Sequence, residues 1–213
     1  MITINISRQF GSGGSYIGKK IANHLGFKYL DSEILNLASK KLGIPEKEVA
    51  IKDERVKGFW ENFFTTFSFA APSDSTYVPP PVEMISDSEF FETESEIIRN
   101  LANRYNAVII GRGASHILAD KPGCINVFIY ASIEFRVKRV MKIYKIDNEK
   151  KAFDMIEKKD DGRKKFIYNI SKKNWNDALN YHLSIDSEAS GFKLAGNMII
   201  NLVNKISEKK EKQ

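Results

Sequence analysis

The stretch SRQFGSGGSYIGKK, residues 7–20, follows the alternating β-branched run MITINI and precedes a segment with helical spacing. Glycines between a strand and a helix let backbone N–H groups converge on an anion, and the start of the helix adds a partial positive charge. Gly11, Gly13 and Gly14 fall within four residues at this junction. The stretch therefore predicts a phosphate-binding loop in preference to a simple tight turn.

The nucleotide-binding motif G-x-x-x-x-G-K-[ST] fits this stretch in two registers. The first register uses Lys19, followed by Lys20, but both lysines then lie a turn inside the expected helix. The second places Arg8 at the first glycine, Gly14 at the lysine and Ser15 at the hydroxyl that could hold Mg²⁺. We prefer the second, because it keeps the distance from strand to loop. Arg8 is then the nearest cation for the β and γ phosphates of a nucleotide.

Composition is consistent with one compact α/β domain, because 213 residues of which 42% are hydrophobic can bury a core. The net charge of +6 indicates either a solvated lysine-rich surface or attraction of a polyanion. The single cysteine excludes an intrachain disulfide. No apolar run approaches the roughly 18 residues of a membrane span, and a strand pattern from residue 2 leaves no room for a signal peptide. We expect a cytoplasmic protein without membrane contact.

Five short segments have the near-continuous apolar character of strands covered on both faces. They are residues 2–7, 27–31, 107–111, 125–131 and 181–186. Helical patterns separate these segments, and the first of them is expected to end at Gly26. Strands that alternate with helices predict a doubly wound parallel α/β sheet.

Two regions interrupt this alternation. Residues 59–69 are dense in aromatic side chains and precede a proline-rich break, so we expect an inserted helical lobe over 46–85. The aromatic segment is the core of that lobe or, alternatively, a flexible lid or the interface of a homodimer. The charged region 148–175 is an exposed amphipathic helix pair or a lid that clamps phosphate. The core of the single domain would comprise residues 1–45, 86–147 and 176–207.

Four further segments occur in an order that resembles bacterial cytidylate kinases. YLDSEIL, residues 29–35, follows the loop helix as LDSG does there, and AVIIGRGAS, residues 107–115, resembles the strand that ends in Gly-Arg-Asp. KKDDGRKKF, residues 158–166, matches an Asp-x-x-Arg lid, and YHLSIDS, residues 181–187, resembles the last strand and adenine-side loop. With the glycine loop, these segments most resemble the divergent cytidylate kinase-like proteins, over residues 2 to about 205.

This resemblance implies the P-loop nucleoside-monophosphate-kinase fold, with a five-stranded parallel core, an inserted acceptor lobe and a lid. It also implies ATP- and Mg²⁺-dependent phosphoryl transfer to a nucleoside monophosphate or a similar small phosphorylated acceptor. The implied ATP-binding residues are Gly11, Ser12, Gly13, Gly14, Ser15 and Asp186.

The resemblance further implies that Arg112 grips the acceptor phosphate and that Asp31 and Ser32 line the acceptor site. Arg163 would close over the transferring group, with Asp160 orienting either Arg163 or the acceptor. Arginine suits both positions, because its planar fork binds phosphate oxygens in a bidentate manner. Simpler alternatives are a structural salt bridge for Arg112, a helix cap for Asp31 and an exposed i,i+3 pair for Asp160 and Arg163.

The sequence departs from true cytidylate kinases at positions that contact the acceptor or the lid. Gly113 stands where that family has the aspartate of Gly-Arg-Asp, and Ile156 stands where it has a lid arginine, with Lys158 or Lys159 as stand-ins. We therefore expect a small-molecule kinase whose acceptor is other than, or broader than, CMP. The alternative, motivated by the missing loop lysine, is a catalytically weak protein that senses a nucleotide. A nucleic-acid-binding protein that uses the basic lid is the third hypothesis.

Overall fold

The computed structural model describes residues 1–31, 34, 37–38, 41 and 87–211. In this part of the chain, five parallel strands form one sheet in the order β2-β3-β1-β4-β5. The strands are β1 (Thr3–Arg8), β2 (Lys28–Leu30), β3 (Ala107–Ile110), β4 (Cys124–Tyr130) and β5 (Leu183–Asp186). The helices are α1 (Gly14–Leu25), α5 (Asp87–Arg104), α6 (Ala114–Ile117), α7 (Ile133–Tyr144), α8 (Glu149–Ser171), the short 3₁₀ turn Ala178–Asn180 and α9 (Ser187–Glu211).

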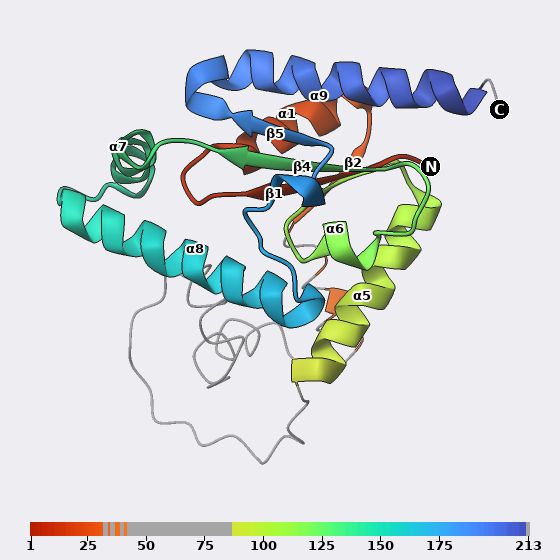
Figure 1. The fold of residues 1–213 in the computed structure, drawn as a ribbon, viewed down its shortest axis with the longest axis horizontal. Helices are drawn as coiled ribbons and strands as arrows, with labels where there is room; N and C mark the ends of the chain where they lie inside the picture. Colours follow the sequence, from red (N-terminus) through yellow and green to blue (C-terminus); the bar gives the residue numbers. More distant parts are fainter. Residues whose placement is uncertain (32–33, 35–36, 39–40, 42–86, 212–213) are drawn as a thin grey trace.

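Helices cover both faces of the sheet, which explains why its strands are apolar throughout. Ile4, Ile6 and Ile110 pack with α1 and α9 in one buried cluster. Ala107 and Ile109, which alternate with these residues along the strands, pack with α5 and α6 in a second cluster. Figure 1 shows α1 and α9 on one side of the sheet and α5, α6 and α8 on the other.

The structure confirms the predicted strands, whose ends differ from the expected ones by at most two residues. It also confirms that α1 ends at Gly26, which has a left-handed φ of 67° and donates its N–H to the carbonyl of Ala22. Lys19 and Lys20 are exposed on α1, as the preferred register of the glycine loop requires.

The interpretation of the charged region as an exposed helix pair is wrong. Residues 149–171 form one continuous helix, α8, which Asn148 caps and which ends where Lys172 turns left-handed. The helix buries an apolar face that includes Ala152, Ile156 and Phe166, and this face packs against α7 and β4. Burial along its whole length keeps this charged sequence in a single helix, since tertiary packing stabilises helices more than intrinsic propensity does.

Several expectations concern residues outside the described part of the chain. These are the inserted lobe at 46–85, the aromatic segment 59–69 with its alternative role in a homodimer, and the acceptor-site residue Ser32. Within the described ranges, none of the helices has the length and apolar character needed to cross a membrane.

Candidate functional site

The connections that follow β1, β3, β4 and β5 meet at the carboxyl edge of the sheet, where open parallel sheets bind their ligands. The glycine loop leaves β1 after Arg8 and enters α1 at Gly14. The connection from β3 begins at Gly111 and leads into α6. Strands β3 and β4 flank β1 in the sheet, so three connections converge around the glycine loop.

Ser12 braces the glycine loop from the side of the sheet. Its side chain is fully buried, and its hydroxyl lies 2.8 Å from the carbonyl oxygen of Gln9 and 3.1 Å from that of Ile129. Its N–H also donates to the carbonyl of Gln9, and its own carbonyl accepts a 2.6 Å hydrogen bond from the hydroxyl of Ser187. The predicted phosphate-binding residue Ser12 thus uses its donors to shape the loop.

The side chain of Arg8 runs directly over two glycines. A Cβ atom on Gly14 would lie 2.6 Å from the Cβ of Arg8, a distance shorter than Cβ atoms in proteins keep from non-bonded atoms. A Cβ atom on Gly111 would collide with a guanidinium nitrogen of Arg8. Neither position can carry a side chain while Arg8 follows this path. The Arg8 guanidinium ends 4.0 Å from the carboxylate of Asp31, beyond β2.

Asp160 holds the glycine loop, α7 and α8 together. One carboxylate oxygen accepts hydrogen bonds from the N–H of Phe10, at 2.7 Å, and from the guanidinium of Arg163, at 3.1 Å. The other accepts from Arg136, at 2.6 Å. Both Asp160 and Arg163 are buried, so the interpretation of these residues as an exposed pair is wrong. Arg163 also donates to the carbonyl of Arg8, at 3.1 Å.

Positive charges crowd the space beside the glycine loop. Burial lowers the pKa of Arg8, and the nearby charge of Arg112 lowers it further against the opposing effect of Asp31. Burial, followed by the charge of Arg8, lowers the pKa of Arg163 to about 9. Both guanidinium groups remain protonated at neutral pH. An anion bound between Arg8 and Arg163 would offset their mutual repulsion.

Arg112 lies in the connection after β3 with a left-handed φ of 58°, and it pairs with Glu94 of α5 at 3.7 Å. Both side chains are buried, and the Glu94 carboxylate has no exposed surface. Burial raises the pKa of Glu94 to about 7, and the charge of Arg112 opposes the rise. The structural salt bridge expected as an alternative for Arg112 is therefore present, and its partner is a residue that the sequence analysis did not identify.

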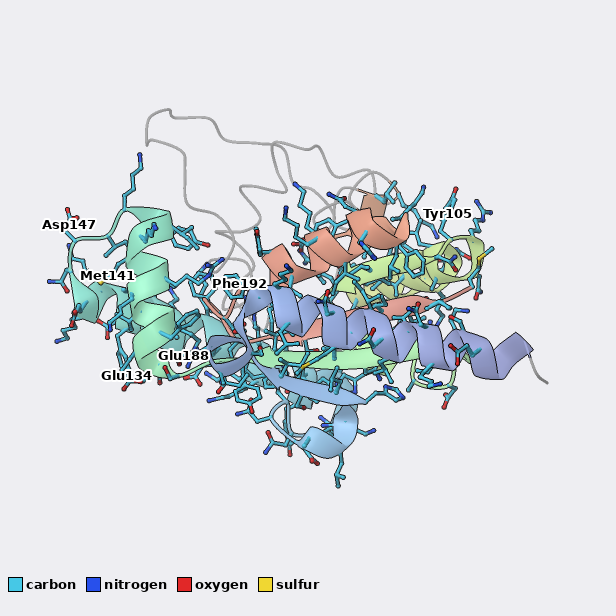
Figure 2. The ribbon with its side chains drawn as sticks, turned by 90° about the horizontal axis from the view of Figure 1, so that it is seen from above. Tyr105, Glu134, Met141, Asp147, Glu188 and Phe192 are labelled. Atoms are coloured by element: carbon cyan, nitrogen blue, oxygen red, sulfur yellow. The ribbon has the colours of Figure 1, made fainter. Side chains whose placement is uncertain are left out.

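Phe192 covers the other side of the glycine loop. A Cβ atom on Gly13, whose φ is 86°, would lie 2.6 Å from the Phe192 ring. The guanidinium of Arg139 lies over this ring, 4.6 Å from its centre, and the ring of Tyr16 lies 5.6 Å away. Phe192 directly follows Gly191, where α9 is interrupted by a non-helical residue. Figure 2 shows Phe192 at the start of the long part of α9.

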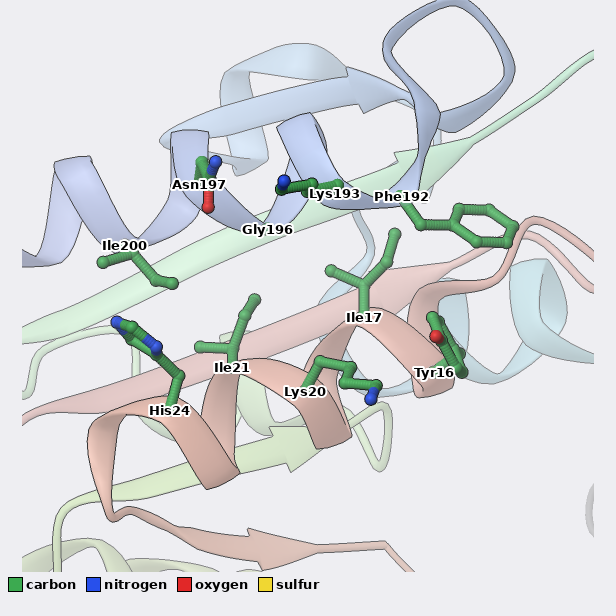
Figure 3. Close-up of a pocket in the computed structure, with 10 residues that line it drawn as sticks. All are labelled: Tyr16, Ile17, Lys20, Ile21, His24, Phe192, Lys193, Gly196, Asn197 and Ile200. Carbon is green, nitrogen blue, oxygen red and sulfur yellow. The ribbon is translucent and has the colours of Figure 1, made fainter.

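A groove of about 470 Å³ runs between α1 and α9, with Tyr16 and Phe192 at one end and His24 and Ile200 at the other (Figure 3). Lys20 and Lys193 add positive charge to its lining. The groove thus extends from the glycine loop along the face of α1 that meets α9.

The remaining predicted site residues lie around the same edge of the sheet. The hydroxyl of Tyr29 donates to Asp31, at 3.3 Å, and lies 3.4 Å from the carbonyl oxygen of Ser15, which belongs to the first turn of α1. Asp186 accepts hydrogen bonds from the N–H groups of Glu188 and Ala189 and so caps α9. Asp31 therefore contacts Tyr29 and lies 4.0 Å from Arg8, whereas the carboxylate of Asp186 stabilises the start of α9.

Among the described residues, no group of three His, Cys, Asp or Glu side chains could hold a metal ion. Mg²⁺ bound with a nucleotide takes one or two protein ligands and completes its shell with phosphate oxygens and water. Ser15, in the first turn of α1 beside the loop, suits such a limited role.

Sequence reasoning missed Glu94, Arg136 and Phe192. A signal for Glu94 was present, because it lies three or four residues from Phe90, Phe91, Ile97 and Ile98 and so falls on the apolar face of α5. Nothing in the local sequence shows that the Phe192 ring reaches the glycine loop.

A glycine loop between β1 and α1 of a parallel sheet with the strand order β2-β3-β1-β4-β5 is the architecture of the P-loop kinase fold. Residues 3–189 match the cytidylate kinase-like family, and the chain belongs to that family.

Solved structures show the same architecture. An uncharacterised protein from Eubacterium ventriosum is 26% identical with a TM-score of 0.68, and the alignment covers 96% of this chain and 99% of that one. Shikimate kinase from Acinetobacter baumannii, in complex with shikimate, is 15% identical with a TM-score of 0.52 and coverages of 96% and 94%. A gluconokinase from Sinorhizobium meliloti is 14% identical with a TM-score of 0.51 and coverages of 98% and 97%. No curated protein matches the sequence.

Replacing Asp160 by Asn should lower the free energy of unfolding by about 3–5 kcal/mol, because two buried guanidinium groups lose their counter-charge. The matched control is Asp161→Asn, whose carboxylate is exposed and pairs with Lys164; this change should stay within about 0.5 kcal/mol. Urea unfolding of both variants measures the difference, and equal stabilities would contradict the role given to Asp160.

Glu94 should make stability depend on pH. Its folded pKa of about 7 lies above the ordinary 4.5, so the folded state binds more protons between these values and loses stability as pH rises through that window. Glu94→Gln should remove this loss, which is on the order of a few kcal/mol. Glu96→Gln, on the exposed side of α5, should keep it. Unfolding curves from pH 4.5 to 8 test this, and parallel profiles for wild type and Glu94→Gln would contradict it.

Proposed function

We propose that this protein transfers the γ-phosphoryl group of Mg²⁺-ATP to a small acceptor that already carries an anionic group, such as a nucleoside monophosphate. The observation that carries the proposal is the path of Arg8 over Gly14. The side chain that would otherwise extend from position 14 is absent, and a permanent cation occupies its space. Phosphoryl transfer depends mainly on positioning and on neutralising charge, so the source of the cation can differ.

In this proposal the glycine loop binds the ATP phosphates, and Ser15 contributes a ligand to Mg²⁺. Arg8 neutralises the β and γ oxygens from the side of β1. Arg163 and Arg136, oriented by Asp160, face the transferring group from α8 and α7. The base of ATP lies near the ring of Phe192.

The acceptor side of the site would use Arg112 and Asp31. An altered specificity is supported by Gly113, which has a φ of 63° and is so close to Ile170 of α8 that a Cβ atom would collide with it. An aspartate at position 113, as in the Gly-Arg-Asp pattern, would have to displace the end of the Ile170 side chain and adopt a left-handed φ. Ile156, at the position of the expected lid arginine, is buried in the core between α7 and α8. The nearby Lys159 places its ammonium 5.1 Å from the centre of the Phe10 ring.

A screen for ADP release over nucleoside monophosphates and other phosphorylated metabolites, with Mg²⁺-ATP, should detect at least one acceptor. Arg8→Met should lower kcat/KM by about 100-fold or more, because a charge on the transferring group loses its partner. Lys19→Met is the matched control, since Lys19 is exposed on α1; it should leave the rate unchanged. ATP binding without turnover on any acceptor would favour the nucleotide sensor instead.

The reciprocal exchange of residues 8 and 14 gives a sharper test. Gly14→Lys alone should abolish tight ATP binding, because its Cβ collides with Arg8, and Arg8→Gly alone should weaken it by removing the cation. The double variant Arg8→Gly, Gly14→Lys has the loop sequence GQFGSGKS, which satisfies the complete motif. Its affinity for Mg²⁺-ATP, measured by calorimetry, should exceed that of both single variants. Additive losses would contradict the idea that one cation replaces the other.

A further inference from the structure

Among the described residues, Glu94 is an unusual ionisable group that takes no part in the proposed reaction. Its side chain has no exposed surface, and neither carboxylate oxygen accepts a hydrogen bond. Its charged neighbour is Arg112, at 3.7 Å, which is too long for a hydrogen bond. The residue stands on the apolar face of α5, whose neighbours Ile98 and Ala102 are fully buried.

A buried carboxylate in such surroundings is costly. Burial penalises the charge, and an ion pair without hydrogen bonds offsets only part of the penalty. A neutral side chain of similar shape would pack at this position without that cost. Glu94 is therefore better explained by what it does for Arg112 than by a contribution to the stability of α5.

No other charge of the described chain compensates Glu94. Of the elements packed against α5, strand β3 has no charged side chain, α6 contributes His116, and α8 contributes Lys164 and Lys165, which are exposed. The pKa of Glu94 responds to its burial and then to Arg112. The pKa of His116 responds to its own burial and to Lys173.

We propose that Glu94 is an internal counter-anion of Arg112, and that an anionic group of the acceptor takes over this function when it binds. Glu94 then takes up a proton from solvent on one carboxylate oxygen, so acceptor binding is coupled to protonation. The inference deepens the proposed function, because it rests on Arg112 as the residue that meets the acceptor.

The coupling follows from the charges at Arg112. Before an acceptor binds, the guanidinium of Arg112 stabilises the Glu94 carboxylate across 3.7 Å. When an acceptor phosphate shares the guanidinium, the buried carboxylate loses part of that stabilisation, while its burial is unchanged. The neutral acid then becomes the favoured form near neutral pH. An anionic acceptor should therefore bind more weakly as the pH rises above 7, and Glu94→Gln should lose this dependence.

The first test needs no acceptor. Carbon-13 NMR of the glutamate carboxyl groups, assigned with Glu94→Gln, follows the titration of Glu94 in the wild type and in Arg112→Gln. Removing the positive charge should raise the titration midpoint by about one unit or more. An unchanged midpoint would overturn the inference whatever the acceptor is, because the charge of Arg112 would then not stabilise the Glu94 carboxylate.

The second test uses CMP as a phosphate-monoester probe. Titration calorimetry at pH 7.5, in two buffers of different ionisation enthalpy, counts the protons bound with the ligand. Wild type and Glu96→Gln should take up a proton fraction that Glu94→Gln does not, while all three bind CMP. Equal proton uptake in wild type and Glu94→Gln would overturn the coupling. Failure of CMP to bind any of them would count against the proposed acceptor class, and the NMR titration would then decide the inference alone.

Discussion

The site depends on a steric constraint between two positions, because Arg8 and residue 14 compete for the same volume. With their Cβ positions 2.6 Å apart, only one of the two can carry a side chain. The chain has the side chain on β1 and the glycine on α1, whereas the usual motif has the reverse. Gly111 extends the constraint, because the Arg8 guanidinium occupies the space above it. The cation therefore starts from a strand that is hydrogen-bonded on both edges, which gives it a rigid base.

Three acidic residues near this cation, Asp160, Asp31 and Glu94, pair with arginines at different distances. Asp160 binds Arg136 and Arg163 through short hydrogen bonds and ties them to the glycine loop. Asp31 is 4.0 Å from Arg8, and Glu94 is 3.7 Å from Arg112. Both distances are longer than the hydrogen bonds that Asp160 makes to its two arginines. Among the described residues, Arg8, Arg112, Arg136 and Arg163 pair with the carboxylates of Asp31, Glu94 and Asp160.

Local patterns were sufficient for the architecture. Apolar strand segments separated by helical spacing predicted the parallel sheet, and the glycines at residues 11–14 marked the loop at its carboxyl edge. The position of Lys19 inside the helical pattern placed this lysine on the surface of α1, away from the loop. The acidic residue within the apolar stripe of α5 could have identified Glu94 as buried. The prediction of an exposed helix pair over residues 148–175 was wrong, because it rested on the charged composition. It gave too little weight to the apolar residues that α8 packs against α7 and β4.

By itself, therefore, the sequence determined the order of strands and helices, the glycine loop and the absence of its usual lysine. These features depend on neighbouring residues, whose spacing sets backbone conformation and burial. Only the tertiary structure decided which groups share the site. Phe10 and Asp160 are 150 residues apart, and Arg163 reaches the carbonyl of Arg8 over 155 residues. Contacts of this range arise from how helices pack on the sheet, so no local spacing records that Gly111 makes room for Arg8 or that Glu94 meets Arg112.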